Sequence, residues 1–154
     1  MTKRYTRLTD NQWEFIREFL PVQRKRRHDL RNIFDALLWI TRTGSQWRNL
    51  DSQFPPWSAV YYYFYCWTKE GRFSWINEAM NIYERSLINR ASTPSLGIID
   101  SQSIKLAPMI YEDRGIDGNK KVNGRKRQII VDILGRVWAA KVHSANQHDG
   151  VSSV

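Results

Sequence analysis

The sequence predicts an α+β protein in which an all-α domain precedes a strand-forming domain. Two observations carry this prediction. Up to about residue 90, apolar residues recur every three or four positions, as they do in amphipathic helices. After the small, polar stretch 91–94, apolar residues come in short runs that are typical of strands. We therefore predict a helical domain over residues 1–90, a linker over 91–94 and a strand domain over 95–154.

The composition indicates a folded and strongly basic protein. The 154 residues suit one ordinary domain or two small ones, and the 42% hydrophobic and 13% aromatic content argues against disorder. The net charge is +9, with an excess of six positive charges up to Pro94 and of three after it. A basic surface on both halves favours a polyanionic partner, nucleic acid first. A charge that only keeps the protein soluble is the alternative.

Neither the cysteine content nor the apolar runs indicate secretion or a membrane. The single cysteine, Cys66, cannot form an internal disulfide, which fits a reducing cytosol. The longest apolar run, Ala36 to Ile40, is far shorter than the ~18 residues that span a bilayer. No apolar stretch follows the basic start, Met1 to Arg7, so we expect no signal peptide. The protein is predicted to be cytoplasmic, nucleoid-associated and without a membrane partner.

The first two helices have clear start and stop signals. Thr9 and Gln12 have the spacing of a capping box, and a helical pattern of about three turns runs on to Pro21. Asp29 is a good N-cap for a second helix, which should stop at Gly44, a residue suited to a helix C-terminus. We expect this second helix to form the centre of the N-terminal core.

A run of positive charge lies between these two helices. It consists of Arg24, Lys25, Arg26 and Arg27. Like charges repel one another, so such a loop usually stays solvated. The same composition also grips the phosphates of nucleic acid. The run by itself leaves both interpretations open.

Two more long helices are predicted after a short one over residues 45–50. Ser58 is expected to cap a helix over 59–69 that stops before Gly71. Its inner stripe is predicted at Val60, Tyr61, Phe64 and Trp67, and its outer face at Tyr62, Tyr63 and Tyr65. The last helix is predicted over 74–90, with the inward residues Trp75, Ala79, Ile82, Tyr83 and Leu87.

This succession of helices resembles a helix-turn-helix arrangement. The helix over 59–69 would then lie in the major groove of DNA, where its exposed tyrosines could donate to phosphates or contact base edges. An aromatic stripe is more often part of a core. The pattern alone does not decide between these two roles.

Three strands are predicted in the second domain. They are expected over 96–99, 128–132 and 137–143, with a loop over 106–119. The second and third strands should form a hairpin that turns around Gly135. Because Ile129 to Val131 is apolar without a break, we expect the second strand to be covered on both faces.

Asp100 is the candidate metal ligand. It directly follows the first predicted strand, where we expect the chain to leave the core. A carboxylate held on a rigid strand at the edge of a sheet can bind a hard divalent cation. The alternative is a simple cap on the turn after the strand, which is the commoner role for such a residue.

A second basic cluster lies at the start of the predicted strand over 128–132. It consists of Lys120, Lys121, Arg125, Lys126 and Arg127. Cations beside a metal-binding carboxylate position a phosphodiester and neutralise the charge that builds in the transition state. The solvated mouth of a hairpin would also be basic, so the cluster alone leaves both interpretations open.

Four other polar residues are weaker candidates for chemistry. Asp132 precedes the hairpin turn and is most simply a turn residue. His143 and His148 are too loosely placed for a metal pair, and no cysteine accompanies them. Asp149 could be a second metal ligand if the third strand returns to the edge that holds Asp100.

Several motifs occur in one order along nearly the whole chain. They are Leu8 to Trp13, Arg27 to Arg31, Ala36 to Trp39, Arg42 to Arg48, Phe54 to Tyr61, Ile99 to Lys105 and Lys120 to Arg127. In these motifs the chain resembles the DDE transposases of bacterial insertion sequences, in particular those of the insertion-sequence-five type.

The resemblance implies an N-terminal domain that binds double-stranded DNA at the element ends and a ribonuclease-H-like catalytic domain. In such transposases two aspartates and a glutamate hold two Mg²⁺ ions. The first aspartate matches Asp100, and Asp149 matches a position before the second. The segments with the other two carboxylates have no counterpart before Val154. We therefore expect an N-terminal portion, either a first-frame product or a fragment, with the first three strands of an incomplete ribonuclease-H-like domain.

The basic clusters, the tyrosines of the third helix and the resemblance together give the predicted site residues. Asp100 is the predicted catalytic and metal-binding residue. DNA contacts are predicted at Arg24, Lys25, Arg26, Arg27, Arg48, Tyr62, Tyr63, Lys105, Lys120, Lys121, Arg125, Lys126 and Arg127. The third helix departs from the family, because tyrosines stand where several arginines are usual. Its electrostatic grip on DNA is therefore weakened.

Three functions fit these observations. The first is the DNA-binding part and first catalytic strand of a Mg²⁺-dependent transposase, active only when frameshifting or assembly joins it to the missing part. The predicted partners are double-stranded DNA and either a second-frame product or, in a homodimer, a second copy of the chain. The second is a stand-alone DNA-binding repressor of transposition, and the third is a decayed product with neither role. A downstream frame that encodes the missing carboxylates would support the first. Because three strands alone leave an apolar sheet exposed, we expect residues 1–90 to fold well and 95–154 to pack poorly.

Overall fold

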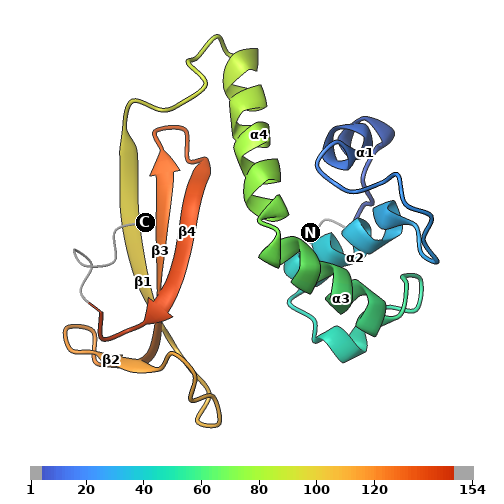
Figure 1. The fold of residues 1–154 in the computed structure, drawn as a ribbon. Coiled ribbons are helices and arrows are strands. Elements are labelled where there is room, and N and C mark those ends of the chain that lie inside the picture. The colour runs from blue at the N-terminus through green and yellow to red at the C-terminus, as the bar shows by residue number, and fades with distance from the viewer. Residues whose placement is uncertain (1–4, 148–154) are drawn as a thin grey trace. The chain divides into compact units, whose positions relative to one another are not determined.

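The structure is a computed structural model that describes residues 5–147. Four α-helices come first and a four-stranded antiparallel sheet follows, which confirms the predicted α+β class (Figure 1). The chain divides into two compact units, Met1–Ile76 and Asn77–Val154. The division falls inside the last helix, before the stretch 91–94. Which parts fold on their own, with the bounds 1–90 and 95–154, stays a prediction.

The first helix, α1 (Asp10–Arg17), is shorter than the sequence suggests. Its capping box is present: the Thr9 hydroxyl accepts from the backbone amide of Gln12 at 3.3 Å, and the Gln12 side chain accepts from that of Thr9 at 2.9 Å. After Arg17 the chain continues in tighter turns, which bury Leu20.

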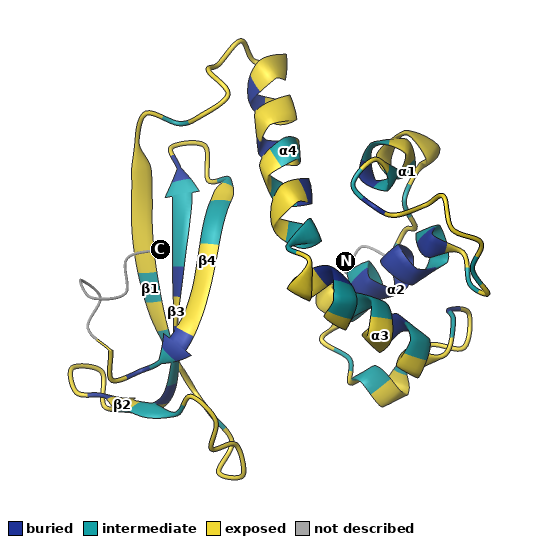
Figure 2. Ribbon diagram, in the orientation of Figure 1, coloured by how far each residue is buried: buried dark blue, intermediate teal, exposed yellow. Residues whose placement is uncertain are grey.

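The second helix, α2 (Leu30–Thr43), is the centre of the first unit, as predicted. Asp29 caps it by accepting from the backbone amide of Arg31 at 3.1 Å. Gly44 ends it with a φ of 67°, a left-handed conformation that favours glycine. Figure 2 shows that α2 is largely buried. Its buried apolar residues are Leu30, Ile33, Phe34, Ala36 and Leu37.

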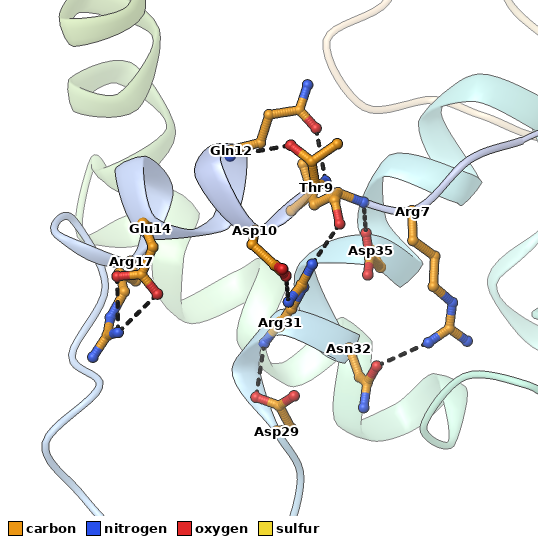
Figure 3. Close-up of polar contacts among 11 residues, drawn as sticks. Arg7, Thr9, Asp10, Gln12, Glu14, Arg17, Asp29, Arg31, Asn32 and Asp35 are labelled. Atoms are coloured by element: carbon orange, nitrogen blue, oxygen red, sulfur yellow. Dashed lines mark hydrogen bonds and ion pairs between the residues drawn. The ribbon is translucent and has the colours of Figure 1, made fainter.

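Polar contacts hold the segment before α1 onto α2 (Figure 3). Asp35 is 1% exposed and accepts hydrogen bonds from the backbone amide of Leu8, at 2.9 Å, and from the hydroxyl of Tyr5. Arg31 donates to the carbonyl of Leu8 at 2.6 Å and pairs with Asp10 at 2.7 Å. These contacts hold the start of α1 against α2.

The short helix η1 (Trp47–Asn49) and the helix α3 (Trp57–Lys69) follow where they are predicted. The predicted cap at Ser58 is wrong, because α3 begins two residues earlier than predicted, with Pro56 at the N-cap. Proline has no N–H to lose and an already restricted φ, so it is well suited to a helix start. Gly71 follows α3 with a φ of 70°, in the role expected of it.

The faces of α3 are mostly as predicted. Val60 and Trp67 are 0% and 2% exposed and pack in the core. Tyr61 is 44% exposed, although the pattern predicts it to be inward. It lies at the border of the buried face, where its ring meets the edge of Trp47 with 5.1 Å between centroids. Tyr62 is 62% exposed, in agreement with its predicted outward position.

The last helix, α4 (Arg72–Leu87), turns a different stripe inward than predicted. Four residues predicted to be inward are exposed: Trp75, Ile82, Tyr83 and Leu87. Ile76 is buried in the core of the first unit, and Asn81 and Arg85 are buried further along the helix. The side-chain amides of Asn77 and Asn81 donate to the carbonyl of Val137 at 2.8 and 2.7 Å. These hydrogen bonds orient the part of α4 that lies in the second unit. The pattern of apolar residues cannot predict such polar contacts.

The sheet has β3 (Val122–Asp132) at its centre (Figure 1). The strands β1 (Gly97–Lys105) and β4 (Val137–Ser144) pair with it in antiparallel order, and β2 (Gly115–Asp117) pairs with its first residues. The predicted hairpin of β3 and β4 is confirmed, and Gly135 has a φ of 77° in its turn.

The sheet differs from the prediction in extent. It has a fourth strand, β2, inside the segment predicted as a loop, and β1 and β3 are longer than expected. Ile129, Ile130 and Val131 are half-buried, so the prediction that they are covered on both faces is wrong. Among the described residues one helix, α4, contacts this sheet, and one helix cannot cover an apolar strand on both faces. The helix-turn-helix and ribonuclease-H-like assignments stay predictions.

No helix among residues 5–147 is both long and apolar enough to cross a bilayer.

Candidate nucleic-acid interface and metal-ligand residue

The basic loop and the tyrosines of α3 lie on one hollow in the first unit. The hollow has a volume of about 980 Å³. Its lining includes all four basic loop residues together with Tyr62, Tyr63, Cys66 and Trp67 of α3. The fold therefore brings together two sets of predicted DNA contacts that are far apart in the sequence.

The charges of the loop are largely available to a ligand. Arg26 donates to the carbonyl of Arg24 at 2.8 Å, which orders the loop. Lys25 and Arg27 are exposed, and neither side chain pairs with any residue in the described part of the chain. A hydrogen bond with Cys66 is the main reason that the pKa of Tyr62 is raised, while the charge of Arg24 acts to lower it. Tyr62 therefore stays a neutral phenol beside the loop.

Arg48 lies apart from this hollow. Its guanidinium stacks on the ring of Trp57 at the start of α3, with 5.7 Å to the centroid. Trp57 is 39% exposed, so the stacked pair is accessible at the N-terminal end of α3. At the other end of the helix, Lys69 stacks on Tyr65 at 4.6 Å. Spacing along the sequence does not predict these cation–π pairs, although the residue types favour them.

Asp100 lies in the middle of β1, opposite Ile129 of β3. The prediction that it sits where the strand ends is wrong, because residues 101–105 continue the ladder to Lys105. The turn-cap alternative fails for the same reason. Asp100 is exposed, and no residue within the range 5–147 makes a hydrogen bond or ion pair with its side chain. A strand interior holds a carboxylate more rigidly than a turn does.

The alternation of side chains along β3 divides the second basic cluster. Opposite residues of an antiparallel pair point to the same face. Asp100 pairs with Ile129 and Gln102 pairs with Arg127, so Arg127 and Asp100 share a face. Arg127 donates to the Gln102 side chain at 2.7 Å. Arg127 is therefore the basic residue that β3 presents beside the candidate ligand, diagonally one pair away.

Lys126 points to the opposite face and is 6% exposed. Its ammonium group donates to the carbonyl of Gln147 at 3.1 Å and lies 3.8 Å from the carboxylate of Asp117. This burial counts against the predicted DNA contact of Lys126. A run of basic residues in a sequence does not show which of them share a face. Once the limits of the strand are known, the alternation of side chains along it does show this.

The other predicted DNA-contact residues of the second unit differ in their positions and contacts. The ammonium of Lys120 donates to the carbonyl of Ser101 at 3.0 Å, and Arg125 donates to the carbonyl of Glu112 at 2.8 Å. Lys121 has a φ of 52° in the turn before β3, and Lys105 ends β1. Lys120 thus contacts the residue next to Asp100, while Arg125 braces the loop before β2.

Asp117 is a buried polar residue that the sequence analysis does not single out. The Ser103 hydroxyl donates to it, as do the backbone amides of Asn119 and Lys120 at 3.0 and 3.1 Å. The hydrogen bond from Ser103 is the largest influence that lowers the pKa of Asp117, to about 2. The Asp-Gly pair at 117–118 is a turn signal that could have indicated its role. It fixes β2 and its turn to β1.

The described residues do not by themselves provide a metal site. No group of three His, Cys, Asp or Glu side chains among them is placed to hold an ion. Asp132 pairs with Gly97, so it lies on the face opposite to Asp100. The candidates His148 and Asp149 lie outside the described residues. One carboxylate is too small a donor set for a pair of Mg²⁺ ions.

Comparisons with known proteins decide the family. Residues 8–77 match a family model described as "Putative transposase of IS4/5 family (DUF4096)", and residues 91–151 match one described as "Transposase DDE domain". The chain belongs to the IS4/5 family of DDE transposases. DDE transposases generally use a divalent metal ion, for which this transposase chain shows one candidate ligand among residues 5–147.

The match to a curated relative is partial. "Uncharacterized protein y4sN" of Sinorhizobium fredii (strain NBRC 101917 / NGR234) is 40% identical over 68 residues, which are 42% of this transposase chain. The match spans 54% of the relative, about half its length. No solved structure matches the chain.

Proposed function

We propose that this chain supplies the DNA-binding part of a transposase together with its first catalytic strand. The observation that carries the proposal is the hollow in the first unit, where the exposed and unpaired Lys25 and Arg27 stand beside the tyrosines of α3. An exposed cation that the protein itself does not neutralise releases counterions when it meets a phosphate. The ligand is double-stranded DNA at the ends of the insertion sequence.

The stacked pair of Arg48 and Trp57 extends the proposed surface to the start of α3. A guanidinium that lies over an aromatic ring still has N–H groups that can donate to a phosphate. Arg48 and the basic loop then contact the DNA backbone. In this arrangement the basic loop contributes most of the affinity for DNA, and α3 positions the DNA on the protein.

In the second unit, Asp100 is proposed as the first carboxylate of the catalytic metal site. Arg127, on the same face, and Lys120, bound to the carbonyl of Ser101, hold positive charge beside it. Bound divalent ions would activate a water molecule and stabilise the leaving oxygen of a phosphodiester. The further carboxylates must come from outside the described residues, either from elsewhere in a longer transposase or from a partner. Without them the chain binds DNA and does not cut it.

Fluorescence anisotropy with a labelled duplex tests the DNA-binding proposal. The double variant Lys25→Ala/Arg27→Ala should weaken duplex binding by roughly tenfold or more and lower the slope of log K against log salt by about two. The control variant Arg90→Ala/Lys141→Ala removes the same charge at two exposed positions elsewhere in the chain. Equal losses in the two variants would show that only net charge matters and would refute the assignment to the loop.

A stand-alone repressor is the second candidate. It predicts the same duplex binding, and it differs from the first in one respect. The repressor gains no cleavage activity when the remaining carboxylates are supplied on a second polypeptide or by extending the reading frame.

A further inference from the structure

The hollow in the first unit differs in shape from a surface that reads a duplex. A recognition helix must protrude, because it enters a major groove about 12 Å wide. Tyr62 and Tyr63 instead line a hollow together with the residues of the basic loop. At about 980 Å³ the hollow falls within the size range of pockets that enclose small ligands, roughly 300–1,000 Å³. It has room for a few nucleotides but not for a double helix.

The aromatic residues that line the hollow are suited to flat, unpaired bases. Tyr62 is 62% exposed, and its ring meets that of Tyr63 edge-on at 5.5 Å. Tyr63 in turn packs on the buried Trp67 at 5.5 Å. The exposed ring of Tyr62 is therefore connected to the buried core through a series of packed aromatic rings. Stacking on such a platform needs the face of a base, which a paired base in a duplex does not present.

The basic residues that line the hollow are suited to the backbone of the same strand. Six basic side chains line the hollow against two carboxylates, Glu18 and Glu70. Glu70 is already paired with Arg72, and Arg17 with Glu14, so these ions largely satisfy each other. The unpaired charge comes from the basic loop. A positively charged groove beside an aromatic platform is the arrangement that single-stranded nucleic acid favours.

We propose that this hollow receives unpaired nucleotides of a DNA strand, with bases stacked on Tyr62 and phosphates held by the basic loop. This inference rests on the proposed DNA binding and extends it: the duplex lies across the rim, and a frayed or single-stranded end enters the hollow. The structure thereby assigns a preference for DNA with an unpaired end. It also gives the tyrosines of α3 a role that does not depend on reading a sequence.

Three probes of the same duplex test the proposal with the full chain. The first is blunt, the second carries a short single-stranded overhang, and the third carries an overhang of equal length in abasic sugar-phosphate. The overhang should raise affinity by roughly tenfold over the blunt duplex, and the abasic overhang should recover little of that gain. The abasic probe has the same charge as the normal overhang, so it separates stacking from electrostatics without any change to the protein.

Variants then locate the effect. Tyr62→Ala should abolish the preference for the overhang, and Tyr62→Phe should keep it, because stacking needs the ring and not the hydroxyl. Tyr65→Ala is the matched control: Tyr65 is 49% exposed on the same helix but does not line the hollow. Because the Tyr62 side chain is largely exposed, its removal should leave the circular dichroism spectrum and melting unchanged.

Several outcomes would overturn the inference. Equal affinity for the blunt and overhang probes would do so, as would full affinity for the abasic overhang, which means a charge-only site. Retention of the preference in Tyr62→Ala, or competition by polyglutamate as strong as that by an oligonucleotide, would exclude base stacking. If instead the blunt duplex is unaffected by Lys25→Ala/Arg27→Ala while the overhang preference stands, the proposed duplex binding fails and the hollow remains a single-strand site.

Discussion

Arg85 of α4 and Asp132 at the end of β3 form a buried ion pair, with 2.9 Å between Nη1 and Oδ2. Arg85 also donates to the carbonyls of Ala91 and Thr93, so it holds the linker as well as the hairpin. Burial by itself would raise the pKa of Asp132, but hydrogen bonds that include those from the backbone of Arg136 and from Arg85 hold that pKa below its ordinary range. The pair therefore joins the part of α4 that belongs to the second unit to the sheet.

We expect Arg85→Met to destabilise the second unit more than any exposed substitution on α4. The change leaves the carboxylate of Asp132 buried without its cationic partner, and the melting temperature should fall by about 10 °C. Glu84→Gln is the matched control, since the pair of Glu84 with Arg136 is partly exposed. Circular dichroism measures both. Similar melting of the two variants would contradict a structural role for the buried pair.

The second prediction concerns acid. Asp117 has an ordinary pKa of 3.8 and a folded-state pKa of about 2, so its stabilising contribution is complete above about pH 4 and is lost as the pH falls toward 2. Asp117→Asn should therefore be less stable than the wild type at neutral pH and should lose less stability on acidification. Thermal unfolding between neutral pH and about pH 2 measures this difference. A wild type and variant whose stabilities fall in parallel would contradict it.

The third prediction concerns a close contact in the sheet. A Cβ atom at Gly124 would lie 1.9 Å from the carbonyl oxygen of Ile104, so the strands β1 and β3 would have to separate. Gly124→Ala should lower the free energy of unfolding by at least about 2 kcal/mol. Gly118→Ala is the control, because its Cβ would meet nothing within 4 Å. Urea unfolding distinguishes the two variants, and equal stabilities would be inconsistent with this contact.

The fourth prediction concerns the two parts of the chain. The first unit has one continuous apolar core, whereas Ala145 is the only buried apolar residue in the described part of the second unit. Limited proteolysis should therefore cut the sheet region early and leave residues up to about 90 as the resistant product. Equal resistance of both parts would show that the sheet is stable without further covering.

The fifth prediction concerns catalysis. With Mg²⁺ and a supercoiled plasmid that carries element ends, the isolated chain should bind without nicking, because Asp100 has no second carboxylate on its face of the strands β1, β3 and β4. Asp100→Asn should leave duplex affinity unchanged in the anisotropy assay. Mg²⁺-dependent nicking by the wild type that disappears in Asp100→Asn would mean that this chain completes a metal site by itself.

Local signals of the sequence predicted some elements well and others poorly. The helix α2 has both a polar cap, Asp29, and a terminal glycine, Gly44, and its predicted limits are confirmed. For α4 the apolar period predicts the helix but not its buried stripe, since Asn81 and Arg85 form the contact in the second unit. The sequence predicts the end of β1 too early, because polar residues from Ser101 onward look like a loop although the ladder with β3 continues through them.

The sequence by itself determined the α+β class, the family motifs, the basic loop and Asp100 as the candidate ligand, since these depend on local composition and spacing. Tertiary structure decided which of these residues meet. It placed the basic loop against Tyr62, put Arg127 on the face of Asp100 and buried Lys126 on the other. The physical reason is that strand pairing and helix packing set the face on which each side chain lies. A shift of one residue in register would reverse that face for every residue of a strand.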